Sequence, residues 1–418
     1  MEIKRDYYLN KLIEAQDDGL IKIITGIRRC GKSYLLNNIF SNYLVNEKKI
    51  PEKQIIKLDL DRKENEKYLN SDELFKYINS KIIKNKKCYI LLDEIQLVGD
   101  FVSVLNSYVD NTDIDVYVTG SNSKFLSSDV VTEFRGRGEE IRIYPLSFSE
   151  FMENYQEDKF EGWNEYITYG GLPEIVANMH TKERKMTYLD NQVKNVYIND
   201  VIERNQIGND SQTILTLLEI LSSSIGSLTN PAKISNTFQS ELKYEIAPAT
   251  IANYLNYLEE SFIIDGAKRY DIKGRKYINT PLKFYYSDIG VRNSIIQYTQ
   301  FEESHIMENV IYNELSRKGY KVSVGKLDYK GTENNKYFYK QLEVDFIATK
   351  GNDKIYIQSA LTMPDKEKRE QEIRPLLLIN DSFRKIVITK DYVPNFKDEN
   401  GIETINLFDF LLNKNMLI

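Results

Sequence analysis

The fold of this chain is decided by the stretch Gly26-Ile27-Arg28-Arg29-Cys30-Gly31-Lys32-Ser33, which satisfies G-x-x-x-x-G-K-[ST] at every defined position. Residues 20–24 before it are mostly apolar and predict a short buried strand. Residues 33–40 after it place apolar side chains at helical spacing. A strand, a glycine-containing loop and a helix in this order bring backbone N–H groups and the positive end of a helix dipole to one point. The stretch therefore predicts a loop that surrounds a phosphate chain.

Side chains of the same loop provide the other groups that a nucleotide site needs. Lys32 provides a mobile cation for the phosphates, and the Ser33 hydroxyl provides a ligand for Mg²⁺. We therefore predict that the chain binds ATP with Mg²⁺. The residues expected to contact the nucleotide are Gly26, Arg28, Arg29, Cys30, Gly31, Lys32, Ser33 and Tyr34.

A second chemical element ends in two carboxylates. Residues 89–92 read Tyr-Ile-Leu-Leu and are followed by Asp93 and Glu94. A nearly unbroken apolar run is typical of a buried parallel strand, which delivers the residues that follow it to the carboxyl edge of the sheet. Asp93 is expected to hold Mg²⁺, and Glu94 to orient and activate the attacking water. An Asp-Glu pair alone is more often a solvated turn, but after a complete phosphate loop it indicates a Walker B motif.

A third strand is predicted at residues 115–119 and opens into small polar residues. Thr119, Ser121 or Asn122 could sense the γ-phosphate, and these residue types are equally typical of a helix N-cap. The residues leave the choice among the three open, and Asn122 is kept as a nucleotide contact. Arg135 and Arg137 precede a last predicted strand, and an arginine near a phosphate can stabilise the charge that develops during transfer.

These motifs resemble a group of bacterial and archaeal AAA+ ATPases that carry a long C-terminal region. The resemblance rests on GIRRCGKS, LLDEIQ, VYVTGSNS and RGRGEEIRIYPLSFSEF, and continues through YGGLPEI and EVDF. It implies an α/β fold with a five-stranded parallel AAA+ P-loop core at residues 1–150. It also implies a homo-oligomer, for which a hexameric ring is the usual AAA+ arrangement. Within it, Arg137 becomes the preferred arginine finger, acting as a catalytic group together with Lys32 and Glu94, and Arg135 is second.

Composition limits the remaining possibilities. The chain has 418 residues, of which 41% are hydrophobic and 28% charged, and a net charge of −6. About three domains are expected from this length. The absence of a long apolar run and of a signal peptide, with only Cys30 and Cys88 as cysteines, predicts a cytoplasmic protein with no membrane contact. The negative net charge restricts any nucleic-acid surface to a local patch.

The middle of the chain is predicted to be helical and then to form a DNA-binding module. Residues 151–210 are interpreted as a helical lid or a connector, and residues 211–300 as a winged-helix domain. Three predicted helices lie at 214–225, 231–238 and 248–258, and a hairpin turns at Gly274.

The predicted hairpin is basic, although the whole chain is acidic. Residues 268–277 contain five basic side chains, one acidic side chain and two tyrosines. This composition predicts contact with a DNA backbone, and the alternative is a protein-binding module with a solvated charged hairpin. The predicted DNA contacts are Thr250, Asn253, Lys268, Arg269, Lys273, Arg275 and Lys276.

Residues 301–418 resemble the restriction-endonuclease fold, whose PD-(D/E)XK site needs an Asp on one strand and E-x-K on the next. Asp345 satisfies the first position, but Gln358 and Ala360 stand where Glu and Lys belong. Glu308 and Glu343 could replace them in part. The domain is therefore expected to be catalytically degenerate and to serve as a binding platform.

Three hypotheses follow from these patterns. The first is an ATPase that couples Mg²⁺-dependent ATP hydrolysis to binding or remodelling of DNA. The second is a slowly hydrolysing nucleotide switch that signals through a protein partner. The third, and least favoured, is an active nuclease with a non-standard site at Asp345.

Overall fold

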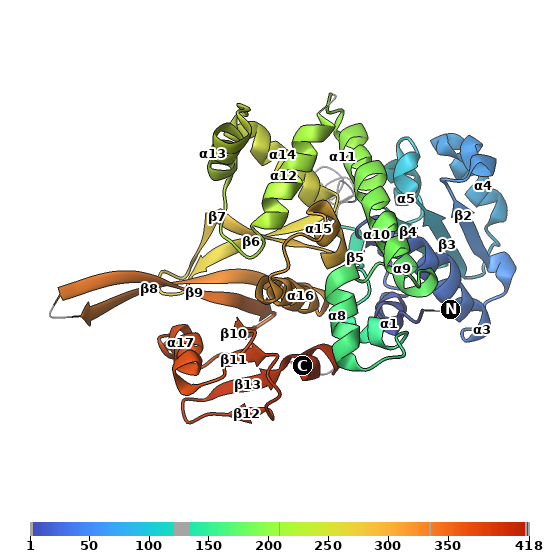
Figure 1. Cartoon of the computed structure of the whole chain (residues 1–418). Coiled ribbons are helices and arrows are strands. Elements are labelled where there is room, and N and C mark those ends of the chain that lie inside the picture. Colours follow the sequence, from blue (N-terminus) through green and yellow to red (C-terminus); the bar gives the residue numbers. More distant parts are fainter. Residues whose placement is uncertain are drawn as a thin grey trace. The chain divides into compact units, whose positions relative to one another are not determined.

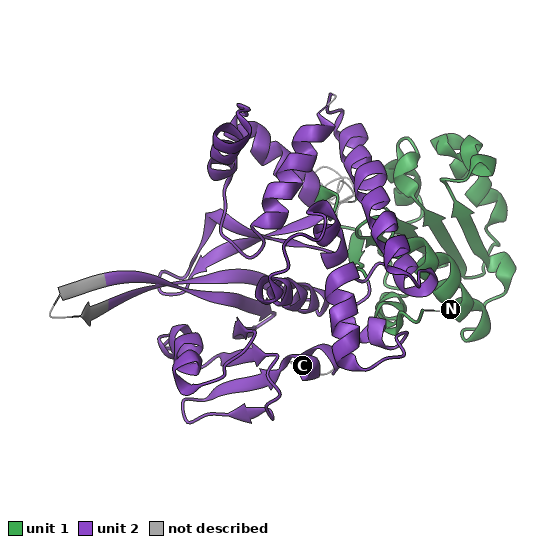
Figure 2. Cartoon of the chain, viewed as in Figure 1, with its two compact units in different colours: residues 1–145, 260–262 green, residues 146–259, 263–418 purple. Residues whose placement is uncertain are grey.

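The computed structural model describes residues 3–120, 134, 136–208, 210–333, 336–413 and 416. The chain forms two compact units (Figure 2). Unit 1 contains residues 1–145 together with 260–262, and unit 2 contains residues 146–259 and 263–418. The finer division of the chain into four domains, with boundaries at 150, 210 and 300, stays a prediction.

Unit 1 is built on a five-stranded, fully parallel sheet with the order β2-β3-β4-β1-β5 (Figure 1). This confirms the expected parallel α/β core of five strands. The inner strands β1, β3 and β4 are buried along their whole length, which explains their unbroken apolar sequences. The strands are β1 (Ile21–Thr25), β2 (Ile55–Asp59), β3 (Cys88–Asp93), β4 (Ile114–Thr119) and β5 (Gly138–Arg142).

Helices surround this sheet and close its core. The helix after the phosphate loop is continuous but changes type twice, as α2 (Lys32–Tyr34), the π-helical η1 (Leu35–Phe40) and α3 (Ser41–Asn46). One core cluster joins Ile23 of β1 and Ile90 of β3 to Leu74 of α4 and Leu105 of α5. The other elements of the unit are α1 (Asp6–Glu14), η2 (Glu52–Gln54), η3 (Lys63–Leu69), α4 (Ser71–Lys81), η4 (Ile95–Leu97) and α5 (Phe101–Asn106).

Unit 2 begins with helices where the sequence predicts them. The region interpreted as a helical lid or connector forms α8, α9, α10, η6 and α11, and the next three predicted helices are α12, α13 and α14. Among the described residues, no helix has the length and apolar character needed to cross a membrane. The helices of this part are α7 (Phe148–Met152), α8 (Lys159–Tyr169), α9 (Pro173–Asn178), α10 (Lys182–Asn191), η6 (Gln192–Tyr197), α11 (Ile198–Asn205), α12 (Ser211–Ser223), α13 (Pro231–Leu242), α14 (Pro248–Glu260) and α15 (Ile289–Ile295).

The YGGLPEI stretch has a packing role within unit 2. Gly170 has a φ of 77°, and a Cβ there would lie 2.1 Å from Oδ1 of Asp288. The next residue, Gly171, donates its backbone N–H to Asp288 Oδ2 at 2.7 Å. Asp288 also caps α15 by accepting the Val291 N–H at 3.1 Å. The two glycines therefore allow the chain to approach a buried carboxylate that holds two segments together.

The rest of unit 2 is organised by an eight-stranded sheet with the order β12-β13-β11-β10-β9-β8-β6-β7. The predicted hairpin exists as β6 and β7, and its turn contains Gly274. The strands are β6 (Ile264–Asp271), β7 (Lys276–Tyr286), β8 (Lys321–Glu333), β9 (Lys336–Lys350), β10 (Asp353–Ala360), β11 (Arg384–Thr389), β12 (Phe396–Lys397) and β13 (Ile402–Asn406). Three helices accompany them, α16 (Glu303–Arg317), α17 (Lys366–Leu377) and α18 (Leu407–Leu412).

The hairpin is continuous with the sheet of the C-terminal part. Strand β6 pairs in parallel with β8 over residues 269–271 and 324–326, so hydrogen bonds join the predicted winged-helix and nuclease-like regions. Strands β8 and β9 then continue together as a twisted ribbon beyond the neighbouring strands (Figure 1). The winged-helix and restriction-endonuclease classes themselves stay predictions.

Candidate nucleotide site

The phosphate loop leaves the carboxyl end of β1 and turns directly into the helix that starts at Lys32. Its first glycine, Gly26, is required both by the lack of room for a Cβ and by the backbone conformation. Gly26 has a φ of 138°, and a Cβ there would lie 2.1 Å from the carbonyl oxygen of Ile143. Gly31 has a φ of 101°, in the left-handed region that glycine adopts at low cost. Glycines at these two positions thus allow the loop to fold back over the sheet edge.

Lys32 lies under this loop and is 4% exposed. Its Nζ donates to the carbonyl oxygens of Gly26 at 2.9 Å and Ile27 at 3.1 Å. The ammonium is therefore held inside the curve of the loop, next to the first of the residues that are predicted to contact phosphate.

Asp93 provides the buried acid of the site, at the carboxyl end of β3, and is 2% exposed. It accepts hydrogen bonds from the hydroxyl groups of Thr119 and Ser33. Burial raises the pKa of Asp93, and the two hydroxyl bonds lower it in part. Ser33 and Asp93, which the sequence assigns to one metal, are therefore in direct contact.

Glu94 follows Asp93 in a left-handed conformation with a φ of 54°. Its backbone N–H donates to Thr119 Oγ1 at 2.9 Å, and its carboxylate accepts a hydrogen bond from the Gln96 side chain. Thr119 thus bridges the two acids, since its hydroxyl donates to Asp93 and accepts from the backbone of Glu94. Of the three possible sensor residues, Thr119 is the one for which the structure gives a position, because Ser121 and Asn122 lie outside the described residues.

Two further acids lie at the same sheet edge and were not predicted. Asp59 ends β2 and is in register with Asp93 on β3. A hydrogen bond with Asp59 and partial burial, together with the charges of Asp93 and Glu94, raise the pKa of Asp61 to about 6. The sequence signal for them is the position of Asp59 and Asp61 at the end of the strand that neighbours β3.

The other predicted nucleotide contacts differ in exposure. Arg28, Arg29, Ser33 and Tyr34 are exposed, and Cys30 is fully buried. Cys30 therefore supports the loop from below and can offer only its backbone to a ligand. Cys30 and Cys88 are both free and buried.

Arg137 lies at the opposite edge of the sheet from the phosphate loop. Its carbonyl oxygen accepts the N–H of Ile21, the first residue of β1, at 2.8 Å. Because the loop leaves the other end of β1, the five-residue strand separates the two by roughly 15 Å. The Arg137 guanidinium lies 3.2 Å from Asp110 and is 39% exposed. Arg135, the second arginine candidate, lies outside the described residues.

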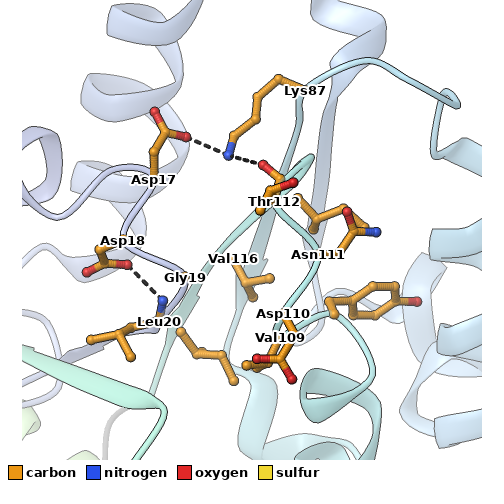
Figure 3. A pocket seen from close by; sticks show the side chains of 13 residues that line it. Asp17, Asp18, Gly19, Leu20, Lys87, Val109, Asp110, Asn111, Thr112 and Val116 are labelled. Carbon is orange, nitrogen blue, oxygen red and sulfur yellow. Dashed lines mark hydrogen bonds and ion pairs between the residues drawn. The ribbon is translucent and has the colours of Figure 1, made fainter.

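A pocket of about 200 Å³ lies at this amino edge (Figure 3). Lys87 reaches across it, with its Nζ 2.5 Å from Asp17 and 3.0 Å from the Thr112 carbonyl oxygen. The pocket lies at the amino ends of β1 and β4, whereas the phosphate loop leaves the carboxyl end of β1, so the two sites are separate. Its lining residues are Asp17, Asp18, Gly19, Leu20, Ile21, Lys87, Tyr108, Val109, Asp110, Asn111, Thr112, Ile114 and Val116.

The predicted DNA contacts lie in unit 2 and are mostly accessible. Exposed members are Asn253 on α14 and four side chains of the hairpin, Lys268, Lys273, Arg275 and Lys276. Thr250 is half-buried. Arg269 does not fit the predicted role as a DNA contact, because it is 7% exposed and its Nη2 donates to Gln341 on β9 at 2.5 Å. Its guanidinium is therefore already bonded to another strand of the sheet.

The donors in unit 1 are compatible with Mg²⁺. A hydroxyl and a carboxylate already in contact, Ser33 and Asp93, are hard oxygen ligands of the kind that Mg²⁺ prefers with water and phosphate completing its shell. Within the described ranges, no group of three or more His, Cys, Asp or Glu side chains is arranged to hold a metal by itself.

Comparison with known proteins supports the same interpretation. A family described as "AAA domain" matches residues 18–152, and a "Domain of unknown function (DUF8612)" matches residues 160–302. The chain is 35% identical over 98% of both lengths to an "Uncharacterized protein" of Haemophilus influenzae. It is 30% identical to "Uncharacterized protein MJ1544" of Methanocaldococcus jannaschii, over 85% of this chain and 77% of that protein.

Among solved structures, the Walker-type ATPase PABY2304 of Pyrococcus abyssi is similar, with a TM-score of 0.50 at 15% identity. The match covers 71% of this chain and 96% of that one. At this identity the likeness concerns the fold. The chain belongs to the same family as the Haemophilus and Methanocaldococcus proteins, and it carries a P-loop ATPase domain of the AAA+ type.

Proposed function

We propose that this protein hydrolyses ATP with Mg²⁺ at the carboxyl edge of the unit 1 sheet. The observation that carries the proposal is the hydrogen-bonded set formed by Ser33, Asp93, Thr119 and the Glu94 backbone. The set joins the helix after the phosphate loop to the carboxyl ends of β3 and β4. It joins a hydroxyl ligand, a buried acid and a potential general base within a few ångströms of the loop.

Each residue of this set has a distinct role in the proposal. Lys32 exchanges its loop carbonyl partners for phosphate oxygens when the nucleotide binds. Ser33 and Asp93 would hold Mg²⁺, which supplies positive charge to the phosphates. Glu94, fixed through its backbone, accepts a proton from the attacking water.

Arg137 is proposed to act in trans. Its position at the amino edge, across the length of β1, separates it from the phosphate loop of its own chain. A homo-oligomer in which this edge faces the nucleotide of the next subunit would let Arg137 stabilise the transferred phosphoryl group. Asp110, 3.2 Å away, would then be exchanged for phosphate.

Substitution Glu94→Gln tests the hydrolytic half of the proposal. The amide keeps the shape of the side chain but cannot accept the proton, so we expect kcat to fall at least ~100-fold, with nucleotide affinity retained. Glu73→Gln on α4 is the matched control, because it makes the same change at an exposed site of the same unit. Undiminished turnover in Glu94→Gln would reject Glu94 as the base.

We further propose that hydrolysis is coupled to DNA through unit 2. Two features support this, the exposed cations of the β6–β7 turn and the exposed aromatic ring of Tyr277, which is 57% accessible. Asn253 lies on the face of α14 opposite its buried side chains. Cations for phosphates and polar groups for base edges are the two kinds of contact that a DNA reader needs.

Charge reversal in the hairpin tests DNA coupling. In Arg275→Glu/Lys276→Glu we expect weaker DNA affinity, a salt dependence reduced by about one counterion for each lost phosphate contact, and loss of DNA-stimulated turnover. The control is Lys366→Glu/Lys397→Glu, which changes charge equally at exposed positions of the same unit. Equal effects of the two double variants would reject a DNA contact at the hairpin.

A nucleotide switch that binds a protein partner remains the second proposal. It is favoured by exposed apolar side chains at the end of α13, where Leu242 and Tyr244 are 50% and 47% accessible. An apolar interface would be nearly independent of salt, whereas DNA binding would weaken steeply as salt rises. Binding that survives high salt and is lost in Leu242→Ser would favour this function over the first.

A further inference from the structure

A buried ion cluster joins three elements of unit 2. Lys283 of β7 is 3% exposed, and its Nζ donates to Glu308 Oε1 at 2.9 Å. The same ammonium lies 2.7 Å from Glu343 Oε1. Glu308 belongs to α16 and Glu343 to β9, so one cation holds carboxylates from two other elements. The sequence patterns gave no role to Lys283.

Neighbouring groups complete this cluster. Glu308 Oε1 also accepts the hydroxyl of Tyr285 at 2.6 Å. Asp345, two residues after Glu343 on β9, is buried and accepts the Ser359 N–H at 2.8 Å. Burial alone would lower the pKa of Lys283, but the charges of Glu308, Asp345 and Glu343 outweigh it and keep the ammonium protonated.

The elements here are α16, β8, β9, β10, α17 and β11 in sequence, and Asp345 lies on β9 next to β10, which carries Gln358 and Ala360. A divalent metal is expected in a nuclease-like site, but the residues present do not suit one. Gln358 and Ala360 on β10 bring no negative charge. The ammonium of Lys283 contacts Glu308 and Glu343, the two carboxylates that could in part replace the missing acid.

We propose that Lys283 takes the place of a divalent cation in this domain. The cluster is a metal-free ionic contact, and its cation is covalently part of the chain. Because Lys283 comes from the hairpin strand β7, the cluster also fixes the hairpin against α16 and β9. A site of nuclease-like layout therefore serves as a structural joint between the predicted DNA-contacting hairpin and the C-terminal sheet, and it does not cleave nucleic acid.

Removing the ammonium should expose the latent cation site. Lys283→Met keeps most of the side-chain volume but removes the ammonium partner of the buried Glu308, which is strongly destabilising. A remaining neighbour that can carry positive charge is His305, whose Nδ1 lies 3.9 Å from Glu308 Oε2. We expect Tm to fall by roughly 5–15 °C. Mn²⁺, held by two carboxylates and water, should then bind and restore much of this loss, since a ligand of the folded state raises Tm.

The experiment is done in the full chain carrying Ser33→Ala and Asp93→Asn, which removes the two proposed metal ligands of the nucleotide site, so that Mn²⁺ bound there does not contribute. Unfolding of unit 2 is followed by Trp163, the single tryptophan of the chain, which is fully buried in α8. Bound Mn²⁺ is counted by electron paramagnetic resonance. With Lys283 present we expect no bound Mn²⁺ and no rise in Tm. With Lys283→Met we expect one bound Mn²⁺ and a rise in Tm.

Two further variants separate the possible outcomes. Lys283→Met/Glu308→Gln removes both charges, so it should recover stability without metal and lose the response to Mn²⁺. Stoichiometric Mn²⁺ binding with Lys283 present, abolished by Glu308→Gln alone, would show an ordinary metal centre and overturn the proposal. A Lys283→Met protein that stays unfolded with Mn²⁺, or folds without binding it, would overturn it as well.

Discussion

Replacing Thr119 with valine tests whether the bridge between the two acids of the nucleotide site matters for catalysis. Thr119 is fully buried at the end of β4, and valine has nearly the same shape. The change removes the hydroxyl that donates to Asp93 and accepts from the Glu94 backbone at 2.9 Å. Glu94 would then lose the bond that holds its left-handed backbone in place.

The expected magnitude follows from these two bonds. An unpaired, half-buried N–H costs about 1–3 kcal/mol, and a bond to a carboxylate contributes about 1.5–3 kcal/mol. If 1–3 kcal/mol of this is lost from the transition state, kcat falls by about 5-fold to 160-fold. The KM for ATP should change little, because Lys32 and its loop carbonyls are untouched.

Steady-state ATPase kinetics measure this effect. Thr119→Ser keeps the hydroxyl and should stay within about threefold of the unmodified protein. Thr25→Val is the matched control, since Thr25 is a buried threonine of β1 whose hydroxyl contacts Glu140 and neither acid of the site. An unchanged kcat in Thr119→Val, or an equal loss in Thr25→Val, would refute the role assigned to the bridge.

Two other expectations concern stability. Gly26→Ala places a Cβ 2.1 Å from the Ile143 carbonyl oxygen. We therefore expect a lower Tm in thermal denaturation and a loss of ATP binding in calorimetry. Unaffected ATP binding would contradict this loop geometry. Burial raises the pKa of Asp288 to about 6, above its unfolded value. Its charge therefore destabilises the folded state above that pH, and this cost is relieved as the pH falls. As the pH falls from about 7 to about 5, the free energy of unfolding of the unmodified protein should rise by about 1 kcal/mol relative to that of Asp288→Asn. Urea denaturation followed by Trp163 fluorescence measures this difference. Equal pH dependence of the two proteins would contradict the prediction.

The sequence predicts unit 1 well because its elements are local and strongly patterned. Each of its three motifs can be recognised from a few consecutive residues. These motifs are the phosphate loop, the apolar strand before Asp93 and the polar residues after β4. Parallel topology then brings the ends of β1, β3 and β4 to one edge, so three separate motifs meet in one candidate site. Asp59 and Asp61 were missed because a carboxylate at the end of an edge strand is common. Whether such a carboxylate belongs to a site depends on which strand lies next to the edge strand, and the sequence does not give that pairing.

Unit 2 is less predictable because its main connections are long-range. The hairpin was recognised from its composition, but its pairing with β8 depends on residues more than fifty positions later in the chain. Arg269 looked like a DNA contact in a basic stretch, yet its partner Gln341 belongs to a distant strand. Lys283 gave no signal for the same reason, since its carboxylate partners lie on α16 and β9.

The two acid clusters of the chain differ in the kind of partner that each carboxylate has. Asp93 is buried against neutral hydroxyl groups, which lower its pKa only in part, so its charge still favours the arrival of a cation. Glu308 is also buried but already has an ammonium within hydrogen-bond distance. A buried carboxylate that has a built-in cation gains little from a metal, whereas one that has only hydroxyl donors gains much. This difference in partners is the physical reason to expect Mg²⁺ in unit 1 and none at the ion cluster of unit 2.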